Sequence, residues 1–242
     1  PLRLVGSEMC IRDRIWDEPF LGFMKNKIDN FEEPFFSTFF SLSSHEPFKV
    51  PEKYENVFPK GNIDMHQVIG YSDNALKTFF NASKNETWFN NTLFIITADH
   101  CNQFWYPYYR NPINRFAIPI MFYHPNNSFK GVNDELTQQL DIFPSVVDLV
   151  GYNKPVNSWG RSLFSSETNQ PFSINFSGTV YRFSMNNYTL VFDGDKIIGV
   201  YSIDDYALEK NVINNADYLK EEKYLKAFFQ DYMDRIIEEK LN

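Results

Sequence analysis

The sequence is poor in cysteine and has no long hydrophobic run. Its two cysteines, Cys10 and Cys101, cannot form a disulfide framework, so they give no information on the redox compartment. No stretch of about 18 consecutive apolar residues is present, which excludes a membrane-spanning helix within the sequence. The N-terminus also lacks the charged and then apolar layout of a signal peptide. If the protein is exported, we expect the exporting segment to lie outside this sequence.

Positive charge is also scarce. Lys and Arg number 23 against 31 Asp and Glu, which gives a formal net charge of -8 at pH 7. Nucleic-acid-binding proteins need a basic surface that displaces phosphate counterions, so this composition excludes nucleic acid as a partner. An acidic chain can still bind a phosphate-bearing substrate if a divalent cation supplies the positive charge. A phosphate-bearing substrate would therefore require a cation site in this chain.

The rest of the composition is that of a globular protein, with 43 % hydrophobic and 22 % charged residues. Residues 1–14 differ, because Gly6–Arg14 resembles translated sequencing-adapter read-through, and we exclude them from the fold prediction. A genuine helical start is the alternative interpretation of that segment. We expect an α/β domain over residues 15–165 and an antiparallel β subdomain with a terminal helix over residues 166–242.

The hydrophobic pattern of the first part predicts alternating strands and helices. Apolar residues at helical spacing predict a helix that starts near Asp17, and two more over residues 65–80 and 135–150. Short apolar runs predict strands over residues 34–42, 92–98 and 117–123. The run 92–98 is continuously apolar, which is typical of a central strand covered by helices on both faces. This order predicts an α/β layer architecture.

Beyond Gly160 the pattern changes to short strands and tight turns. Strands are predicted over residues 172–183, 188–192 and 196–201, and Asn186-Asn187 and Asp193-Gly194-Asp195 supply the turn chemistry between them. The last segment, residues 216–241, has the charge and apolar spacing of an amphipathic helix. The second part is therefore predicted to be an antiparallel meander followed by a helix.

The strongest candidate for chemistry is the pair Asp99-His100, which directly follows the apolar run 92–98. Ligands of open α/β sheets bind outside the carboxyl ends of the strands, so this pair would face a site. Carboxylate oxygen and imidazole nitrogen are suitable ligands for a divalent metal. The alternative is structural, with Asp99 capping a turn and His100 hydrogen-bonded within the loop.

The order of several motifs resembles the lipoteichoic acid synthase-like sulfatases of the alkaline phosphatase superfamily. Thr97-Ala98-Asp99-His100 resembles their metal motif, and Ser43-Ser44-His45-Glu46-Pro47-Phe48 resembles their His-x-Pro-Phe segment. Further similar segments, in chain order, are Tyr71–Leu76, Gln139–Gly151, Gly160–Phe164, Val200–Asp205 and Leu208–Asn211. The resemblance covers nearly all of the chain from Ile15 onward. It implies a partial alkaline phosphatase-like α/β/α sandwich with a small C-terminal antiparallel sheet and a terminal helix.

The resemblance also implies roles for three residues. Asp99 and His100 would be metal ligands, with Mn as the expected ion and Mg or Zn as alternatives. His45 would contact the substrate head group or the leaving oxygen, and the alternative is a histidine that caps the end of a strand. The family's hydroxyl nucleophile and a further acidic ligand are expected upstream of this chain, so we nominate no nucleophile and expect the fragment itself to be inactive.

The implied activity is that of a metal-dependent sulfatase-like hydrolase or transferase of bacterial, extracytoplasmic type. It would transfer phosphoglycerol or a related phospho-alcohol, or cleave a phosphodiester, on a lipid or glycan head group. The intact parent would be anchored in the cytoplasmic membrane by N-terminal helices outside this sequence. Sulfate-ester hydrolysis and phosphoethanolamine transfer are alternatives on the same scaffold. A non-catalytic fragment that binds a partner or a glycan is the alternative of another class.

The remaining candidates have weaker signals. Arg115 could reach an anionic substrate, but a solvated loop arginine fits equally well, and we leave it out of the ligand set. We interpret His66 and His124 as structural, because no carboxylate lies near them at metal spacing. Cys101 would need an electropositive environment to act as a thiolate ligand or nucleophile. Four aromatic residues could form a binding surface or pack against the neighbouring strand: Trp105, Tyr106, Tyr108 and Tyr109.

Overall fold

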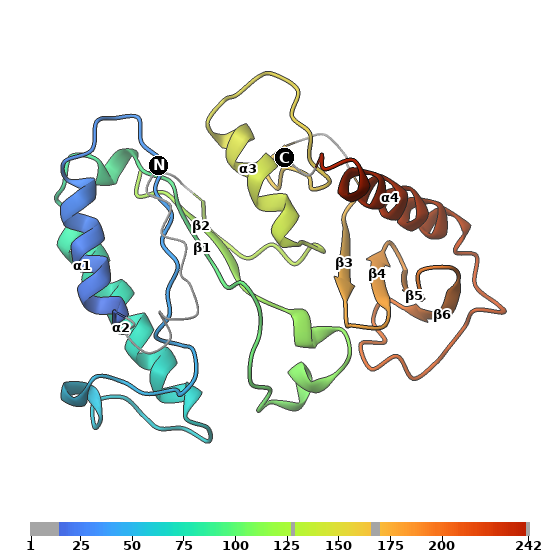
Figure 1. The fold of residues 1–242 in the computed structure, drawn as a ribbon, viewed down its shortest axis with the longest axis horizontal. Coiled ribbons are helices and arrows are strands. Elements are labelled where there is room, and N and C mark those ends of the chain that lie inside the picture. Colours follow the sequence, from blue (N-terminus) through green and yellow to red (C-terminus); the bar gives the residue numbers. More distant parts are fainter. Residues whose placement is uncertain (1–14, 127–128, 166–169, 241–242) are drawn as a thin grey trace. The chain divides into compact units, whose positions relative to one another are not determined.

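The computed structural model of the chain describes residues 15–126, 129–165 and 170–240 (Figure 1). It divides into two compact units. The first comprises the residues up to Thr97 together with Met121–Lys130, and the second comprises Ala98–Ile120 together with Gly131–Asn242. Residues 1–14, which the sequence sets apart as adapter-like, lie outside the described residues. The domain boundary predicted at residue 165 stays a prediction.

Helices α1 (Asp17–Ile28) and α2 (Met65–Ser83) lie side by side and form the helical part of the first unit (Figure 1). Both predicted helices are confirmed. Helix α2 buries Val68, Tyr71 and Ala75 completely, as expected for an amphipathic helix that packs on one side. The apolar Ile69 does not share this buried side, because it lies one residue, or about 100°, around the helix from Val68, and it is exposed.

The N-terminus of α1 is organised by a buried carboxylate. Asp17 does not cap the helix from outside, because the N-cap position is Trp16 and Asp17 is the first helical residue. Its carboxylate accepts hydrogen bonds from the Ser43 backbone N–H at 3.2 Å and from the hydroxyls of Ser41 and Ser72 at 2.9 Å each. The Ser43 hydroxyl in turn accepts a hydrogen bond from the Asp17 N–H at 2.9 Å. This one side chain therefore joins α1, α2 and the segment around Ser43.

The strand predicted over residues 34–42 is wrong. The segment is extended but belongs to no sheet within the described residues. Its side chains alternate, with Phe35 and Phe39 half-buried and Phe36 and Phe40 exposed. A continuous apolar run indicates burial on both faces, but here only one face packs and no neighbouring backbone supplies a ladder of hydrogen bonds.

The two remaining predicted strands of the first part pair with each other. Strand β1 (Phe94–Thr97) and strand β2 (Ile120–Tyr123) form a two-stranded sheet. Phe94 packs against a cluster built on buried Ile28, Trp88 and Phe89. The first three residues of β1 are half-buried and Thr97 is exposed, so the expected cover on both faces is not met within the described residues.

The second unit contains one short helix next to the loop that follows β1. Helix α3 (Ile142–Leu149) is preceded by a 3₁₀ turn over Gln139–Asp141. The predicted start at residue 135 is wrong, because Gln138 and Asp141 form a capping box that begins the helical segment later. Four other 3₁₀ turns are present in the described chain: Glu52–Tyr54, Phe89–Asn91, Pro107–Arg110 and Asn114–Phe116.

The predicted meander is confirmed, with one more strand than expected. Its sheet has the sequential antiparallel order β3 (Phe172–Phe176), β4 (Tyr181–Met185), β5 (Tyr188–Phe192) and β6 (Ile197–Ser202). The predicted strand over residues 172–183 is two strands, because Gly178 turns the chain at a φ of 85°. Asn186 adopts a φ of 50° in the turn between β4 and β5, a conformation that Asn tolerates better than most residues.

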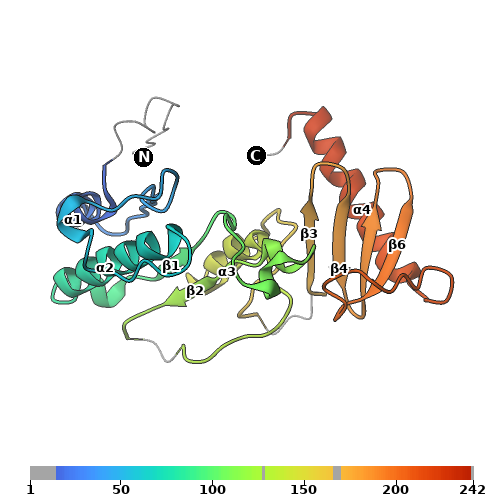
Figure 2. The ribbon, with the colours of Figure 1, turned by 90° about the horizontal axis from the view of Figure 1, so that it is seen from below.

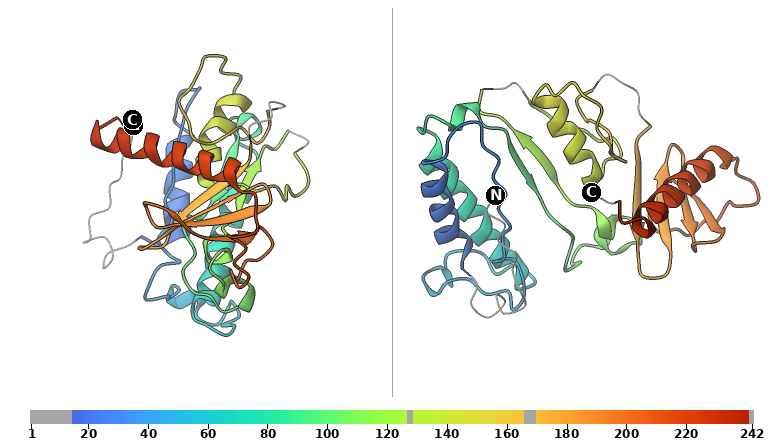
Figure 3. Two further views of the ribbon diagram at one scale, coloured as in Figure 1. Left: turned by 90° about the vertical axis from the view of Figure 1, so that its right-hand side faces the viewer. Right: turned by 45° about the horizontal axis from the view of Figure 1, so that its top comes forward.

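Helix α4 (Leu219–Ile237) covers one face of this sheet (Figures 2 and 3). Leu225 is fully buried and joins a core of strand residues that includes Phe183, Leu190 and Val200. The predicted tail helix is thus confirmed, although it is shorter at both ends. No helix among the described residues is both long and apolar enough to cross a membrane.

Candidate functional site

Asp99 and His100 lie beside each other in the loop that follows β1. Their side chains are 54 % and 65 % exposed, and the His100 Nε2 lies 3.5 Å from the Asp99 Oδ2. The His100 Nδ1 lies 2.8 Å from the carbonyl oxygen of Cys101. Because a carbonyl oxygen can only accept, Nδ1 carries the hydrogen in this contact, and a neutral ring then keeps its lone pair on Nε2. A carboxylate oxygen and an imidazole lone pair therefore lie next to each other.

This donor set fits a divalent cation. Metal-bound histidines commonly donate their second ring N–H to a carbonyl, as the His100 ring does here. Among the described residues, no group of three or more His, Cys, Asp or Glu side chains is placed to hold a metal ion, so this pair offers two ligands. The Asp99 Oδ1 also accepts the His100 backbone N–H at 2.9 Å, which suits the structural alternative. Metal binding by the pair stays a prediction.

Gln139 fixes the backbone of this loop. Its side-chain amide donates hydrogen bonds to the carbonyl oxygens of Ala98 and Asp99, at 2.9 and 3.0 Å. Gln139 begins the 3₁₀ turn before α3, so the start of that helix is tied to the residue that would bind the metal. The local sequence around Gln139 does not reveal this role, because both acceptors lie far from it along the chain.

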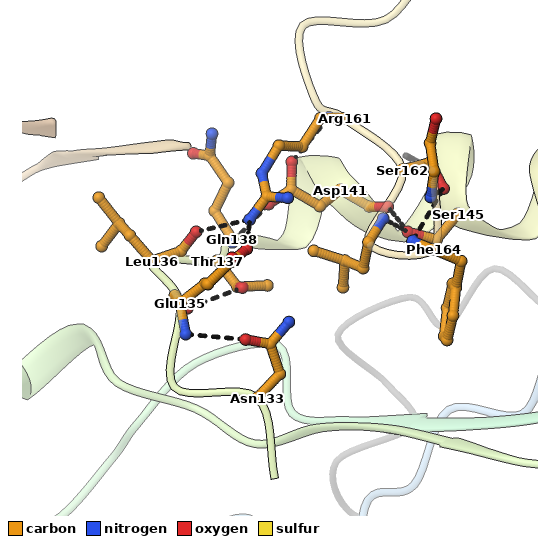
Figure 4. A network of polar contacts seen from close by, with 12 residues as sticks. Asn133, Glu135, Leu136, Thr137, Gln138, Asp141, Ser145, Arg161, Ser162 and Phe164 are labelled. Carbon is orange, nitrogen blue, oxygen red and sulfur yellow. Dashed lines mark hydrogen bonds and ion pairs between the residues drawn. The ribbon is translucent and has the colours of Figure 1, made fainter. Parts of the chain in front are cut away.

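A buried carboxylate, Asp141, holds the start of α3 in place (Figure 4). It accepts hydrogen bonds from the backbone N–H groups of Gln138 and Arg161, at 3.0 and 2.9 Å. The Arg161 side chain pairs with Glu135 at 2.8 Å. Gly160 passes so close that an added Cβ would lie 2.0 Å from the Leu140 carbonyl oxygen. This network connects the segment around Gly160 to the turn that carries Gln139.

A cavity of about 200 Å³ opens beside the pair. Its lining comprises Asp99, His100, Cys101, Phe104, Arg115, Phe116, Ile118, Gln139 and Asn175. The Cys101 thiol donates to the Ala117 carbonyl at 2.7 Å, and burial raises its pKa. A raised pKa keeps the thiol protonated near neutral pH, which argues against a thiolate ligand or nucleophile.

His45 lies in the first unit, whereas Asp99 and His100 lie in the second. It is exposed, and its Nδ1 lies 3.2 Å from the Glu46 carbonyl oxygen. Two residues before it, Ser43 is completely buried and bound to Asp17, so the segment that carries His45 is anchored. The role of His45 in substrate binding stays a prediction.

The other candidate side chains take different places. His66 and His124 each accept a backbone N–H through Nδ1, from Asn62 and Asn126 respectively, which fits the structural interpretation. The four aromatic residues of the loop are all exposed, which favours the surface interpretation over packing against the neighbouring strand: Trp105, Tyr106, Tyr108 and Tyr109.

Solved structures place this arrangement of elements in the alkaline phosphatase-like fold. A protein of the alkaline phosphatase superfamily from Vibrio parahaemolyticus matches 89 % of this chain and 56 % of its own, with a TM-score of 0.70 and 20 % identity. The lipoteichoic acid synthase LtaP of Listeria monocytogenes matches 90 % of this chain and 59 % of its own, with a TM-score of 0.64 and 16 % identity.

The family is shown by sequence. The sulfatase family model matches residues 6–152, which is more than half of the chain, and the chain belongs to this family. Lipoteichoic acid synthase 1 of Bacillus subtilis is 26 % identical over 183 residues, which cover 67 % of this chain and 28 % of that protein. Lipoteichoic acid synthase of Staphylococcus aureus is 28 % identical over 160 residues, which cover 57 % and 24 %. The chain therefore spans about a quarter of the length of these curated relatives.

Proposed function

We propose that this chain carries the metal-binding part of a sulfatase-family enzyme that transfers phosphoglycerol, or cleaves a related phosphodiester, on a lipid or glycan outside the cytoplasm. Its relatives named as lipoteichoic acid synthases support the phosphoglycerol chemistry. In this proposal Asp99 and His100 hold the cation, Mn in preference to Mg or Zn, and His45 binds the substrate head group. The extracytoplasmic, membrane-anchored setting of the parent protein belongs to the same proposal.

The observation that carries the proposal is the paired geometry of Asp99 and His100. Their facing atoms, 3.5 Å apart, are both electron-pair donors when the ring is neutral. A cation between the two donors would be favourable for both, because two acceptors gain nothing from each other directly. A bound divalent ion supplies Lewis-acid stabilisation of charge on a phosphoryl oxygen. The chain's own part is to orient the two ligands, which the Gln139 amide does through the loop carbonyls.

His45 would act on the same substrate by hydrogen bonding. A neutral imidazole can donate to a phosphate oxygen, and an imidazolium can protonate a departing alkoxide. No hydroxyl or thiol in residues 15–242 is assigned as the nucleophile. We therefore expect the 242-residue chain to release negligible product from phosphoglycerol or aryl phosphate substrates.

The proposal is tested by the effect of Mn on thermal stability. An ion that binds only the folded chain raises the melting temperature, with a stabilisation of about 2.7 kcal/mol at a hundredfold excess over its dissociation constant. We expect this rise in the parent chain and its loss in Asp99→Ala and His100→Ala. The control is Asp204→Ala, which removes an exposed carboxylate from a turn of the same unit.

Two results would overturn the metal site: no Mn-dependent rise in the parent chain, or an equal rise in Asp99→Ala and Asp204→Ala. Substrate class is tested separately with aryl phosphodiesters and aryl sulfates as probes. Sulfate-ester turnover by the chain would favour the sulfatase alternative. Robust turnover of either probe would show that the nucleophile lies within residues 15–242.

A further inference from the structure

Strand β4 carries an arginine, Arg182, that has buried nitrogens without a hydrogen-bond partner among the described residues. Arg182 is half-buried, and its Nε and Nη1 atoms are buried and have no hydrogen-bond partner among the described residues. None of the ion pairs in the described part of the chain includes it. A buried guanidinium without an acceptor is unfavourable, because the lost hydration is not replaced. Such a group is expected to meet an acceptor from outside the chain.

A second arginine lies close enough to repel it. The pKa of Arg182 is lowered, first by burial and then by the positive charge of Arg115. Arg115 also belongs to none of the ion pairs of the described residues, and its guanidinium lies over the Phe104 ring at 5.2 Å. The ring holds the planar group without neutralising it. Neither arginine has an ion-pair partner among the described residues, and their like charges act on each other within the second unit.

One of the two arginines lines the cavity that contains Asp99 and His100, and the other pairs across the sheet with a residue that lines it. Arg115 lines it directly, together with Asn175 on β3. Asn175 is the cross-strand partner of Arg182, so the two side chains project from the same face of the sheet. The amide of Asn175 can donate a further, neutral hydrogen bond to an anion in the cavity.

We propose that Arg115 and Arg182, with Asn175, form a binding site for a phosphate-class oxyanion next to the Asp99-His100 pair. Guanidinium groups match the oxygens of phosphate with paired N–H donors, and an anion there would satisfy the buried nitrogens of Arg182 and relieve the repulsion between the two cations. This inference rests on the proposed function only in assigning the anion to the substrate. The substrate would then carry two anionic groups, one at the cation and one at the arginines.

The anion site is tested in the absence of metal, with inorganic phosphate as the probe. The full chain is titrated in EDTA at constant ionic strength, and phosphate binding is followed by calorimetry and by melting temperature. We expect Arg182→Met and Arg115→Met each to raise the phosphate dissociation constant at least tenfold. Lys226→Met is the control, because it removes the same charge from the surface of α4, where Lys226 pairs with Glu222, and it should stay within twofold of the parent chain.

A second measurement separates lost binding from lost folding. Replacing a half-buried, unpaired charge by an apolar side chain of similar length should not destabilise the chain. Without phosphate, Arg182→Met should therefore melt at the parent temperature or above it, by up to roughly 2–4 °C. If Arg115→Met fails to fold, Arg115→Lys is the substitute, because it keeps the positive charge but loses the paired N–H donors of the guanidinium. Its affinity for phosphate should lie between those of the parent chain and of a variant without the charge.

The outcomes distinguish this site from the metal site. Asp99→Ala should lose Mn-dependent stabilisation and bind phosphate in EDTA at least as tightly as the parent chain. If the parent chain fails to bind Mn but still binds phosphate through the arginines, the proposed function falls and the anion site stands. The anion site is overturned if both arginine variants bind phosphate like the parent chain, or if Asp99→Ala abolishes binding in EDTA.

Discussion

Removal of the Asp17 carboxylate should release the segment that carries His45. Asp17 is 3 % exposed and accepts three hydrogen bonds, from the Ser43 N–H and the hydroxyls of Ser41 and Ser72. A hydrogen bond to a charged acceptor contributes about 1.5–3 kcal/mol, but Ser41 is exposed and water can replace its bond. For Asp17→Ala we therefore expect a loss of about 3–5 kcal/mol, close to that for breaking a buried charge network. Asp17→Asn keeps the shape and should cost about 1–2 kcal/mol.

The assay is hydrogen–deuterium exchange of peptides that cover α1 and residues 41–46. A loss of 3–5 kcal/mol in local opening energy corresponds to amide exchange that is faster by roughly a hundredfold or more. The control is Asp73→Ala, which removes an exposed carboxylate from α2 next to Ser72 and should change exchange little. The reasoning is refuted if Asp17→Ala and Asp73→Ala exchange alike in these peptides, or if Asp17→Asn is as damaging as Asp17→Ala.

Two further predictions concern the second unit and its turns. Gly160→Ala should destabilise the chain by about 2 kcal/mol or more in urea unfolding, because the added Cβ would lie 2.0 Å from the Leu140 carbonyl oxygen. The control, Gly22→Ala in α1, has open space around the added Cβ and should stabilise the chain by about 0.5–1 kcal/mol. Equal effects of the two substitutions on the free energy of unfolding would contradict the close approach at Gly160. Hydrogen bonds from the backbone N–H groups of Lys196 and Asp195 lower the pKa of Asp193 below its usual 3.8, so its stabilisation is present above pH 3.8 and is lost as the pH falls through the lower, folded-state pKa. The difference in melting temperature between the parent chain and Asp193→Asn should therefore narrow below about pH 3.8, and a constant difference would refute the assignment.

Elements specified by nearby residues could be predicted from the sequence. Helix α2 and the strands of the meander follow from local apolar spacing and from turn residues such as Asn186 and Gly194, both of which have positive φ. The segment over residues 34–42 could not be predicted in this way. Its apolar composition resembles that of a buried strand, but strand formation depends on a partner backbone that a local pattern does not reveal.

Only the part of the candidate site that is local in the sequence could be predicted. The pairing of Asp99 with His100 follows from their adjacency after an apolar run, whereas the support from Gln139 arises from a residue 40 positions away. The start of α3 was misplaced because polar capping by Gln138 and Asp141 overrides the apolar spacing upstream. Arg182 could have been noticed as a charge between the aromatic residues of a predicted strand, but its lack of a counter-ion is visible only in three dimensions.

The late position of Leu225 has a consequence for synthesis on the ribosome. The strands of the meander emerge in order and pair with their immediate neighbours, so the ladder can form as the nascent chain lengthens. Their apolar face stays open until α4 follows, because Leu225 closes the core that contains Phe183 and Val200. A chaperone that shields exposed apolar surface would therefore have its longest opportunity to act between the emergence of β6 and that of α4.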